Sequence, residues 1–378
     1  MGRHAHPQRQ RPARRHPALL TVDNDDFIPR LAERIRDGAA RKARFRIRGG
    51  GTKDFYGGAA QGEPLDVAQY AGIIAYEPRE LVVTVRAGTR LAELEAALAA
   101  ERQMLAFEPP HFGAGATIGG TVAAGFSGPR RPYAGSARDF VLGARIVNGK
   151  GEDLGFGGRV IKNVAGYDVS RLMAGALGTL GVITELSFKV LPRPVAEASL
   201  AFQLGEAKAI EQANRWAGQP LPISAAAWHD GVLRVRLSGA QSAVAAACAR
   251  LGGEEMPDAD SFWRDLREHR LPFFAGNGGS CAPLWRLCVP QAAAPIAAPH
   301  AQLIDWGGAQ RWVVGELDPL AIRSSVERSG GHATLFRGGD KSQGVFHPLK
   351  PAIAKIHRGL KDAFDPAGIL NPGRLYDF

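Results

Sequence analysis

The stretch from Glu108 to Phe140 is rich in residue types that bind anions through main-chain amides, hydroxyl groups and guanidinium groups. Its glycines permit positive φ values and a close approach of the backbone to a ligand. Its hydroxyl and basic residues supply further hydrogen-bond donors. These residues are Gly113, Gly115, Gly119, Gly120, Gly125, Gly128, Thr117, Thr121, Ser127, Arg130, Arg131 and Arg138. The pattern predicts a diphosphate-binding loop, with a solvent-exposed glycine loop as the alternative, because glycine-rich turns are common.

Two further glycine runs have the same chemical character. Residues 43–48 alternate apolar and charged side chains, which predicts a half-buried strand. The turn that follows lacks the GxxxxGK(S/T) spacing of a P-loop and the GxGxxG spacing of a Rossmann turn, and consists of Gly49, Gly50, Gly51, Thr52 and Lys53. A third run, Gly175, Gly178 and Gly181, precedes a strand predicted over residues 182–190. Three such runs favour one elongated phosphate-containing ligand.

His111 has the best position among candidate acid–base residues, because it lies beside the central glycine loop. A histidine between Pro110 and Phe112 also suits a structural role in which it hydrogen-bonds the loop. The C-terminal region offers Arg337, Lys341 and His347 as further polar candidates. No HExxH, GxSxG or cysteine–histidine pair indicates a metal site or an acyl-transfer mechanism. We therefore expect no metal, and the catalytic residue stays open with His111 as its candidate.

The composition describes a folded protein with a basic extension. The chain has 378 residues, 45% hydrophobic side chains and a net charge of +10, and five arginines lie within its first twenty residues. Those twenty residues contain no apolar segment of signal-peptide length, so we expect residues 1–20 to be disordered and not to bind nucleic acid. Three cysteines are too few for a disulfide framework or an iron–sulfur cluster and fit a reducing cytoplasm. No window approaches the roughly 20 apolar residues that span a bilayer.

The remaining pattern predicts the elements that position these loops. The first half has a helix over residues 25–37, strands over 81–85 and 140–147, a leucine-rich helix after Gly88-Thr89, and a hairpin turn at Asn148-Gly149. From residue 195 the glycine motifs stop, and the predicted order is strand, helix, two strands and helix over residues 195–251. This βαββα order is typical of a ferredoxin-like unit. Strands are then predicted near residues 282–287 and 332–336, a hairpin near 305–308, and helices over 318–328 and 349–364.

Four ungapped segments match a known pattern: GGGTK, EPPHFG, ATIGGTVAAGFSGPRRPYAGSARDFVLG and GGRVIKNVAGYDVSRLMAGALGTLGVITELSFKVLPRP. They resemble the flavin-binding domain of the vanillyl-alcohol-oxidase/p-cresol-methylhydroxylase (PCMH-type) superfamily, and more closely the FAD-binding subunits of bacterial glycolate oxidases. The resemblance covers about residues 43 to 194 and resumes at the C-terminus. It implies an α+β fold in which residues 21–194 form a PCMH-type FAD-binding domain of two α/β subdomains.

The resemblance also implies the organisation of the rest of the chain. Residues 195–345 would form a ferredoxin-like α+β cap that faces substrate or partners. Residues 346–378 would form a helix and a closure segment that returns to the FAD domain, where Asn371 or Arg374 would face the isoalloxazine.

FAD is the cofactor that the resemblance implies. The residues expected to bind it are Gly49, Gly50, Gly51, Thr52, Lys53, Thr117, Gly119, Gly120 and Thr121 at the diphosphate, Gly125, Ser127 and Gly128 at the ribityl and isoalloxazine side, Ile183 at the adenine, and Pro110, Gly115 and Ile118 in the central loop. Covalent relatives have a histidine or a cysteine where this chain has Thr52, Ala114 and Ala116. The resemblance therefore implies non-covalent FAD.

The function implied is that of the FAD-binding subunit of a glycolate, or 2-hydroxy acid, oxidase or dehydrogenase. A paralogous catalytic FAD subunit and an iron–sulfur subunit would be its partners, and the complex would be cytoplasmic, with any contact to the inner membrane made through those partners. Substrate-oxidising relatives carry a His-x-Gly-Asp-Gly-Asn-type metal motif, where this chain has Arg337-Gly338-Gly339-Asp340. A free-standing FAD-dependent dehydrogenase of a D-lactate-like acid and a non-catalytic scaffold with little flavin are the alternatives.

Overall fold

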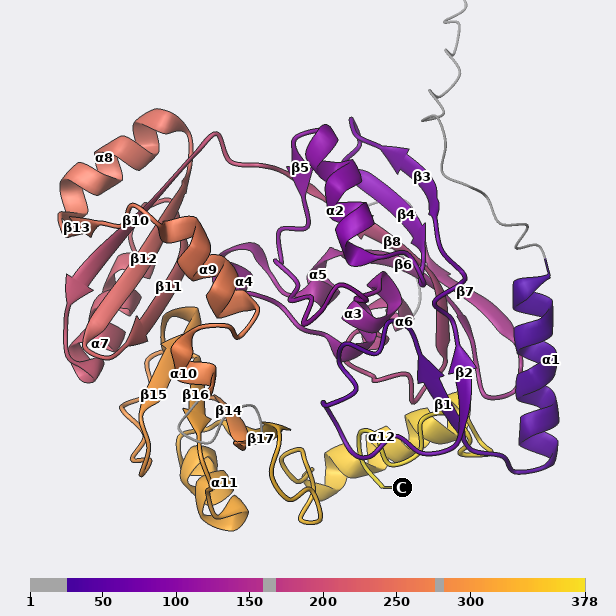
Figure 1. Cartoon of the computed structure of the whole chain (residues 1–378). Helices are drawn as coiled ribbons and strands as arrows, with labels where there is room; N and C mark the ends of the chain where they lie inside the picture. The colour runs from indigo at the N-terminus through magenta and orange to yellow at the C-terminus, as the bar shows by residue number, and fades with distance from the viewer. Residues whose placement is uncertain (1–25, 159–167, 276–281, 378) are drawn as a thin grey trace, which may run out of the picture.

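The computed structural model describes residues 26–158, 168–275 and 282–377. The extension predicted for residues 1–20 lies outside these ranges, as does the RVIKNVAGY part of the fourth matching segment. Figure 1 shows two large sheets on opposite sides of the molecule, with the C-terminal helix α12 below and between them. In the described ranges, no helix combines the length and the apolar character needed to cross a bilayer.

The first subdomain consists of a helix and two short parallel strands. Its elements are α1 (Phe27–Ala40), β1 (Phe45–Arg48) and β2 (Glu63–Asp66). Ile28, Leu31 and Ile35 form the buried face of α1 and pack with Phe45 of β1. The predicted helix and strand are both confirmed, although α1 continues to Ala40 because Ala39 and Ala40 favour helix and no proline or capping glycine stops it.

The second subdomain contains an antiparallel sheet of five strands in the order β3-β4-β8-β6-β7. Its strands are β3 (Ile73–Glu77), β4 (Val82–Arg86), β6 (Val141–Val147), β7 (Asp153–Gly157) and β8 (Val182–Lys189). The helices are α2 (Leu91–Ala100), α3 (Ile118–Ala124), α4 (Arg131–Ala134), α5 (Ala137–Phe140) and α6 (Val169–Leu172), and β5 (Gln103–Met104) pairs with β9 (Leu191–Pro192). Leu91, Leu94 and Leu98 of α2 are fully buried in the core of this subdomain, as the sequence predicts.

The cap is built on a sheet of eight strands in the order β13-β10-β12-β11-β15-β16-β14-β17. Its strands are β10 (Ala196–Gln203), β11 (Ile223–His229), β12 (Val232–Gly239), β13 (Glu254–Glu255), β14 (Leu284–Cys288), β15 (Gln302–Asp305), β16 (Gln310–Val314) and β17 (His332–Arg337). Its helices are α7 (Glu206–Ala217), α8 (Gln241–Leu251), α9 (Ala259–Arg267), α10 (Pro272–Ala275), the 3-10 helix η2 (Trp306–Gly308) and α11 (Pro319–Arg328). The first four strands have the 4-1-3-2 order of a ferredoxin-like βαββαβ unit. The second four extend the same sheet.

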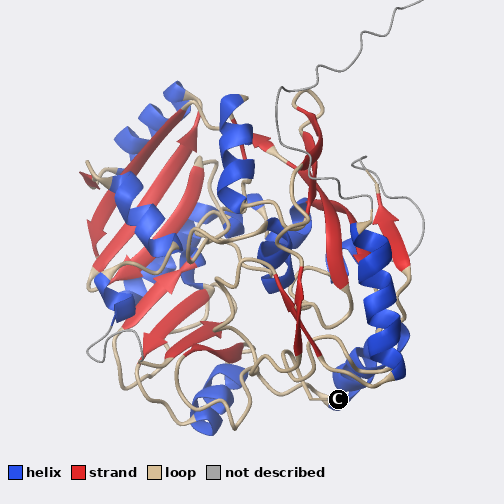
Figure 2. Cartoon of the chain, turned by 45° about the vertical axis from the view of Figure 1, so that its right-hand side comes forward, coloured by secondary structure: helices blue, strands red, loops and turns tan. Residues whose placement is uncertain are grey.

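Alternating side chains give the two faces of the cap sheet different neighbours. Ala226 and Leu233 pack with α7 and α8 in one apolar cluster. Ala225 and Ala227, which point the other way along β11, belong to a cluster with Trp263 of α9 and with aromatic residues of the FAD-binding half. The second face therefore joins the cap to the glycine-rich half of the chain. Figure 2 shows the backbones of these two halves from another direction.

The C-terminal helix α12 (Pro351–Phe364) has the apolar stripe that the sequence predicts, but it has no buried residue. Ile353 is 45% exposed and Ile356 is 58% exposed, whereas Leu360 and Phe364 pack partly against the five-stranded sheet. Periodicity thus identifies the helix correctly, and only its second half uses the stripe for packing within this chain.

Candidate functional site

The three glycine runs meet in one cleft. Its cavity has a volume of about 100 Å³ and is lined by residues of all three runs and by Asn371 and Arg374 of the C-terminal segment. We call it the glycine cleft. Of the residues predicted to bind the cofactor, those that line it are Gly49, Gly50, Gly51, Thr52, Lys53, Thr117, Gly119, Gly120 and Ile183.

Close backbone packing explains why glycine stands at the first run. A Cβ at Gly50 would overlap the carbonyl oxygen of Gly115, and a Cβ at Gly49 would overlap the hydroxyl of Thr117. The first run therefore packs directly on the central loop, and Gly115 serves that contact without lining the cleft. Thr117 also caps α3, since its Oγ1 accepts a hydrogen bond of 3.3 Å from the amide of Gly120.

The charge of the glycine cleft suits an anion. Among the described residues, Arg46, Arg48, Lys53 and Arg374 line it together with one acidic residue, Asp54. The Lys53 ammonium donates to the carbonyl oxygen of His111 at 3.2 Å. Burial lowers the pKa of Lys53 to about 8, against an opposing effect of Glu268.

Two buried donors near the cleft lack a partner. The Nε of Arg46, which lines the cleft, and the hydroxyl of Thr121 on α3, which does not line it, have no hydrogen-bond partner among the described residues. A buried donor without a partner costs about 1–3 kcal/mol, which an anionic ligand would recover. The cradle of glycines, the excess of cations and the unpartnered Arg46 donor therefore fit the diphosphate of a dinucleotide.

The other predicted residues surround the cleft without lining it. Gly125 lines a larger neighbouring groove. Pro110, Ser127 and Gly128 lie beside a small cavity of about 30 Å³ between the two halves of the chain. Ile118 is fully buried in the core beneath α3, so any contribution to the ligand would come from its backbone.

His111 does not face the glycine cleft. Its Nε2 lies 2.8 Å from a carboxylate oxygen of Glu95 on α2, and its backbone amide donates to Glu268 of the cap. The C-terminal candidates also make structural contacts: Lys341 donates to the carbonyl oxygens of Phe55 and Gly57 at 2.7 and 2.9 Å. The Lys341 bonds tie the cap to the segment after the first glycine run. None of these contacts places a base at the cleft.

Aromatic rings from both halves of the chain fill the space next to the cleft. This aromatic seam consists of Tyr56, Phe112 and Phe126 with His269 and Phe336 of the cap, and its ring centroids are 4.6 Å apart for Tyr56 and Phe126 and 5.2 Å apart for Phe126 and Phe336. Burial among these rings holds the pKa of His269 well below its usual value. The sequence did not indicate the seam, because its members are scattered over 280 positions without a shared spacing.

A buried ionic network crosses the same boundary. The Glu108 carboxylate accepts hydrogen bonds from Arg130 at 3.2 Å and from Arg236 of the cap at 2.8 Å. Burial raises the pKa of Glu108, but the two arginines more than offset this effect and leave its pKa below the usual value. Asp305 lies nearby, and burial, reinforced by the charge of Glu108, raises its pKa to about 7.

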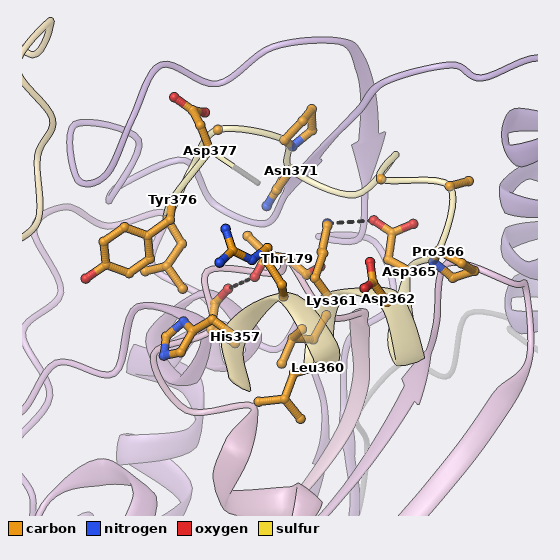
Figure 3. Close-up of a pocket in the computed structure, with 18 of the residues that line it drawn as sticks. Thr179, His357, Leu360, Lys361, Asp362, Asp365, Pro366, Asn371, Tyr376 and Asp377 are labelled. Carbon is orange, nitrogen blue, oxygen red and sulfur yellow. Dashed lines mark hydrogen bonds and ion pairs between the residues drawn. The ribbon is translucent and has the colours of Figure 1, made fainter. Parts of the chain in front are cut away.

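The closure segment fastens the first and third glycine runs to each other. Asn371 accepts a hydrogen bond from the amide of Ile47 at 2.8 Å and donates to the carbonyl oxygen of Leu177 at 2.7 Å. Lys361 of α12 forms an ion pair of 2.6 Å with the fully buried Asp365. Figure 3 draws these side chains where α12 meets the segment after it. We call Lys361, Asp365 and Asn371 the C-terminal clasp.

Comparison with known proteins gives this geometry a family. A sequence profile described as a FAD binding domain matches residues 28–157. The glycolate oxidase subunit GlcE of Escherichia coli (strain K12) is 47% identical over 351 residues, which cover 93% of this chain and 98% of that protein. The D-lactate dehydrogenase of Anaerostipes hadrus is 36% identical over 183 residues, which cover 48% of this chain and 35% of that protein.

Solved structures agree at the level of the fold. Alkyldihydroxyacetonephosphate synthase superposes with a TM-score of 0.63 at 15% identity, over 90% of this chain and 74% of that one. The fold and the cleft together define a FAD-binding flavoprotein of the PCMH type. Within that class, the chain belongs to the family of the glycolate oxidase subunit GlcE. The predicted fold class and the predicted cofactor, FAD, are thereby confirmed.

Proposed function

We propose that this chain is the FAD-binding subunit of a multi-subunit glycolate oxidase, which oxidises glycolate, a 2-hydroxy acid, to glyoxylate. The observation that carries the proposal is the 47% identity to a glycolate oxidase subunit over 98% of that subunit's length. Bound FAD would supply the hydride-accepting chemistry that this oxidation needs. Electrons would then pass to a partner iron–sulfur subunit, with a paralogous FAD subunit completing the complex.

The chain's own residues would divide the work of holding FAD. Gly49 to Lys53 and Gly119-Gly120 would bring amides and an ammonium group to the diphosphate, and Ile183 would lie at the adenine. Neither histidine nor cysteine occurs among the described residues that line the glycine cleft, which supports a non-covalent cofactor. We place the complex in the cytoplasm, with any membrane contact made through the partners.

Expression of this chain alone and together with its partner subunits tests the proposal. We expect a yellow protein whose flavin stays oxidised when glycolate is added without partners, and is reduced once the partners are present. Bleaching of the lone protein by glycolate or D-lactate would instead identify a free-standing dehydrogenase. A colourless protein that still restores activity to the partners would identify a scaffold.

Lys53 should make FAD affinity depend on pH. Its pKa of about 8 describes the cofactor-free chain, where burial disfavours the ammonium, and a bound diphosphate favours the ammonium again. Binding therefore takes up a proton above pH 8, so the affinity should fall by up to about tenfold per pH unit from there upward. Fluorescence titration of FAD at pH 7, 8 and 9 measures this slope.

Two lysine variants show whether the pH dependence of FAD affinity comes from Lys53. Lys53→Met should bind FAD more weakly at pH 7 and show no slope between pH 7 and 9. Lys150→Met, at an exposed turn, should keep the native profile. A native profile that is already flat, or the same slope in Lys53→Met, would show that Lys53 does not meet the diphosphate.

A further inference from the structure

A groove next to the glycine cleft carries a cluster of cationic side chains. It has a volume of about 680 Å³ and lies between the two halves of the chain, with Gly125 and Gly175 from one half and Arg286 and His332 from the other. Ala124 lines both this groove and the glycine cleft, so the two spaces adjoin. Arg131 and Arg138 add two further guanidinium groups to that of Arg286, and we call this space the arginine groove.

No acidic side chain balances these cations within the groove. Neither aspartate nor glutamate is among its described lining residues. The ion pairs of the described ranges involve other residues than Arg131, Arg138 and Arg286. Asp139 influences Arg131 and Arg138 from outside the groove, but its carboxylate already accepts hydrogen bonds from the amide and hydroxyl of Ser136.

The contacts that Arg131 and Arg286 make with described residues leave guanidinium N–H groups available to a ligand. Arg131 lies over the ring of Trp306, with its guanidinium carbon 4.2 Å from the ring centroid. Arg286 donates to the hydroxyl of Tyr56 at 2.9 Å, while its buried Nε has no partner among the described residues.

Positive charges in the groove disfavour the charged forms of Arg131 and His332. Partial desolvation of its guanidinium lowers the pKa of Arg131; the charges of Arg286 and Arg138 add to this effect, and Cys288 and Asp139 oppose it. Burial, Arg286 and Arg131 likewise lower the pKa of His332. A bound anion would relieve this repulsion, because it favours the charged form of each neighbour.

We propose that the arginine groove binds a small carboxylic acid as its carboxylate, beside the FAD held in the glycine cleft. Guanidinium groups pair with carboxylates through two parallel hydrogen bonds, which makes arginine better suited than lysine to this ligand. The groove has room for such a ligand, since its volume falls in the usual range of ligand sites and nothing lies within 4 Å of a Cβ built on Gly175. That the acid is a 2-hydroxy acid or its 2-oxo product rests on the function proposed above.

Binding can be measured apart from turnover with a carboxylate that cannot be oxidised. 2-Hydroxyisobutyrate keeps the hydroxyl and the carboxylate of a 2-hydroxy acid but has no hydrogen on C2 to give up. Calorimetric titration of the full chain, with and without FAD, should show saturable binding of 2-hydroxyisobutyrate and none of its neutral amide. Inorganic phosphate should compete weakly. Tighter binding of phosphate than of the carboxylate would overturn the choice of ligand.

Exposed arginines allow a test that keeps the protein folded. Arg131→Gln and Arg138→Gln should each weaken binding of 2-hydroxyisobutyrate by about tenfold or more, because each removes a charge-assisted hydrogen bond. Arg79→Gln, in an exposed turn, should leave the affinity unchanged. Equal affinity in all three variants would overturn the proposal.

These experiments can refute the carboxylate site without refuting the proposed function, and the proposed function without refuting the site. A chain that binds FAD and supports glycolate oxidation with its partners, but does not bind 2-hydroxyisobutyrate, would refute the groove as a carboxylate site and leave the proposed function standing. A chain that binds 2-hydroxyisobutyrate but supports no glycolate oxidation with its partners would keep the groove as a carboxylate site and refute the proposed function.

Discussion

Replacing Gly120 with valine is expected to weaken FAD binding by roughly 10- to 100-fold while leaving the protein folded. Gly120 lines the glycine cleft, and a Cβ at this position meets only the hydroxyl of Thr117, at 3.2 Å. The added methyl groups would occupy space in a cavity of about 100 Å³ that the cofactor needs. Flavin absorbance of the purified variant and a fluorescence titration with FAD measure the loss.

Two other glycines serve as controls for the valine substitution. Gly155→Val lies on the edge strand β7, where a Cβ has no atom of a described residue within 4 Å, so FAD binding and stability should both stay native. Gly119→Val should destabilise the fold as well, because its Cβ would lie 2.7 Å from the Cβ of Ala87. Native FAD content in Gly120→Val would mean that the dinucleotide does not pass over this residue.

Local pattern made much of the FAD-binding half predictable. Strand β1 and helices α1 and α2 follow from alternation and from the spacing of apolar residues. The capping signals do not contribute, because the N-cap residues Asp26 and Arg90 make no side-chain capping hydrogen bond. Glycine runs at the ends of these elements indicated that the backbone of each run approaches a ligand closely. The hairpin turn was predictable from the Asn148-Gly149 pair. In the structure the Asn148 side-chain oxygen accepts hydrogen bonds of 3.0 Å from the amides of Lys150 and Glu152.

Contacts between distant residues could not be predicted in this way. Glu108 pairs with Arg236 across 128 positions, and Lys341 reaches Phe55 across 286 positions. A single sequence contains no periodicity that links such partners. The same limit applies to the cap, where four further strands join the ferredoxin-like unit through only two register pairs between β11 and β15, Trp228 with Ile304 and His229 with Leu303.

The arginine groove contains residues that the sequence pattern singled out and residues that only the fold brings there. Arg131 and Arg138 belong to the central stretch that already indicated an anion from the sequence. Arg286 and His332 come from cap strands β14 and β17 and had no such indication. The fold brings both pairs to one groove, so two arginines that the sequence assigned to the diphosphate loop line a different space, which the FAD-binding half shares with the cap.

Replacing Asp365 with alanine is expected to lower the free energy of unfolding by about 3–5 kcal/mol. The Asp365 carboxylate is fully buried, pairs with Lys361 at 2.6 Å, and accepts hydrogen bonds from the amides of Ile369 and Leu370 at 3.2 and 2.8 Å. Its loss leaves the largely buried Lys361 ammonium without its counter-ion. Urea unfolding measures the change, and Asp362→Ala, exposed on the same helix, should unfold like the native chain.

The double variant Lys361→Met/Asp365→Leu distinguishes two causes of destabilisation. One is the loss of the attraction between the two ions, and the other is the buried lysine charge that remains unpaired. It removes both ions, so it should be less destabilised than Asp365→Ala even though two substitutions are made. Because the clasp also positions Asn371 between Ile47 and Leu177, Asp365→Ala should bind FAD more weakly than the double variant does. If both variants lost equal stability, the lysine charge would not be the cause. If both kept native FAD affinity, the closure segment would fasten the chain without shaping the glycine cleft.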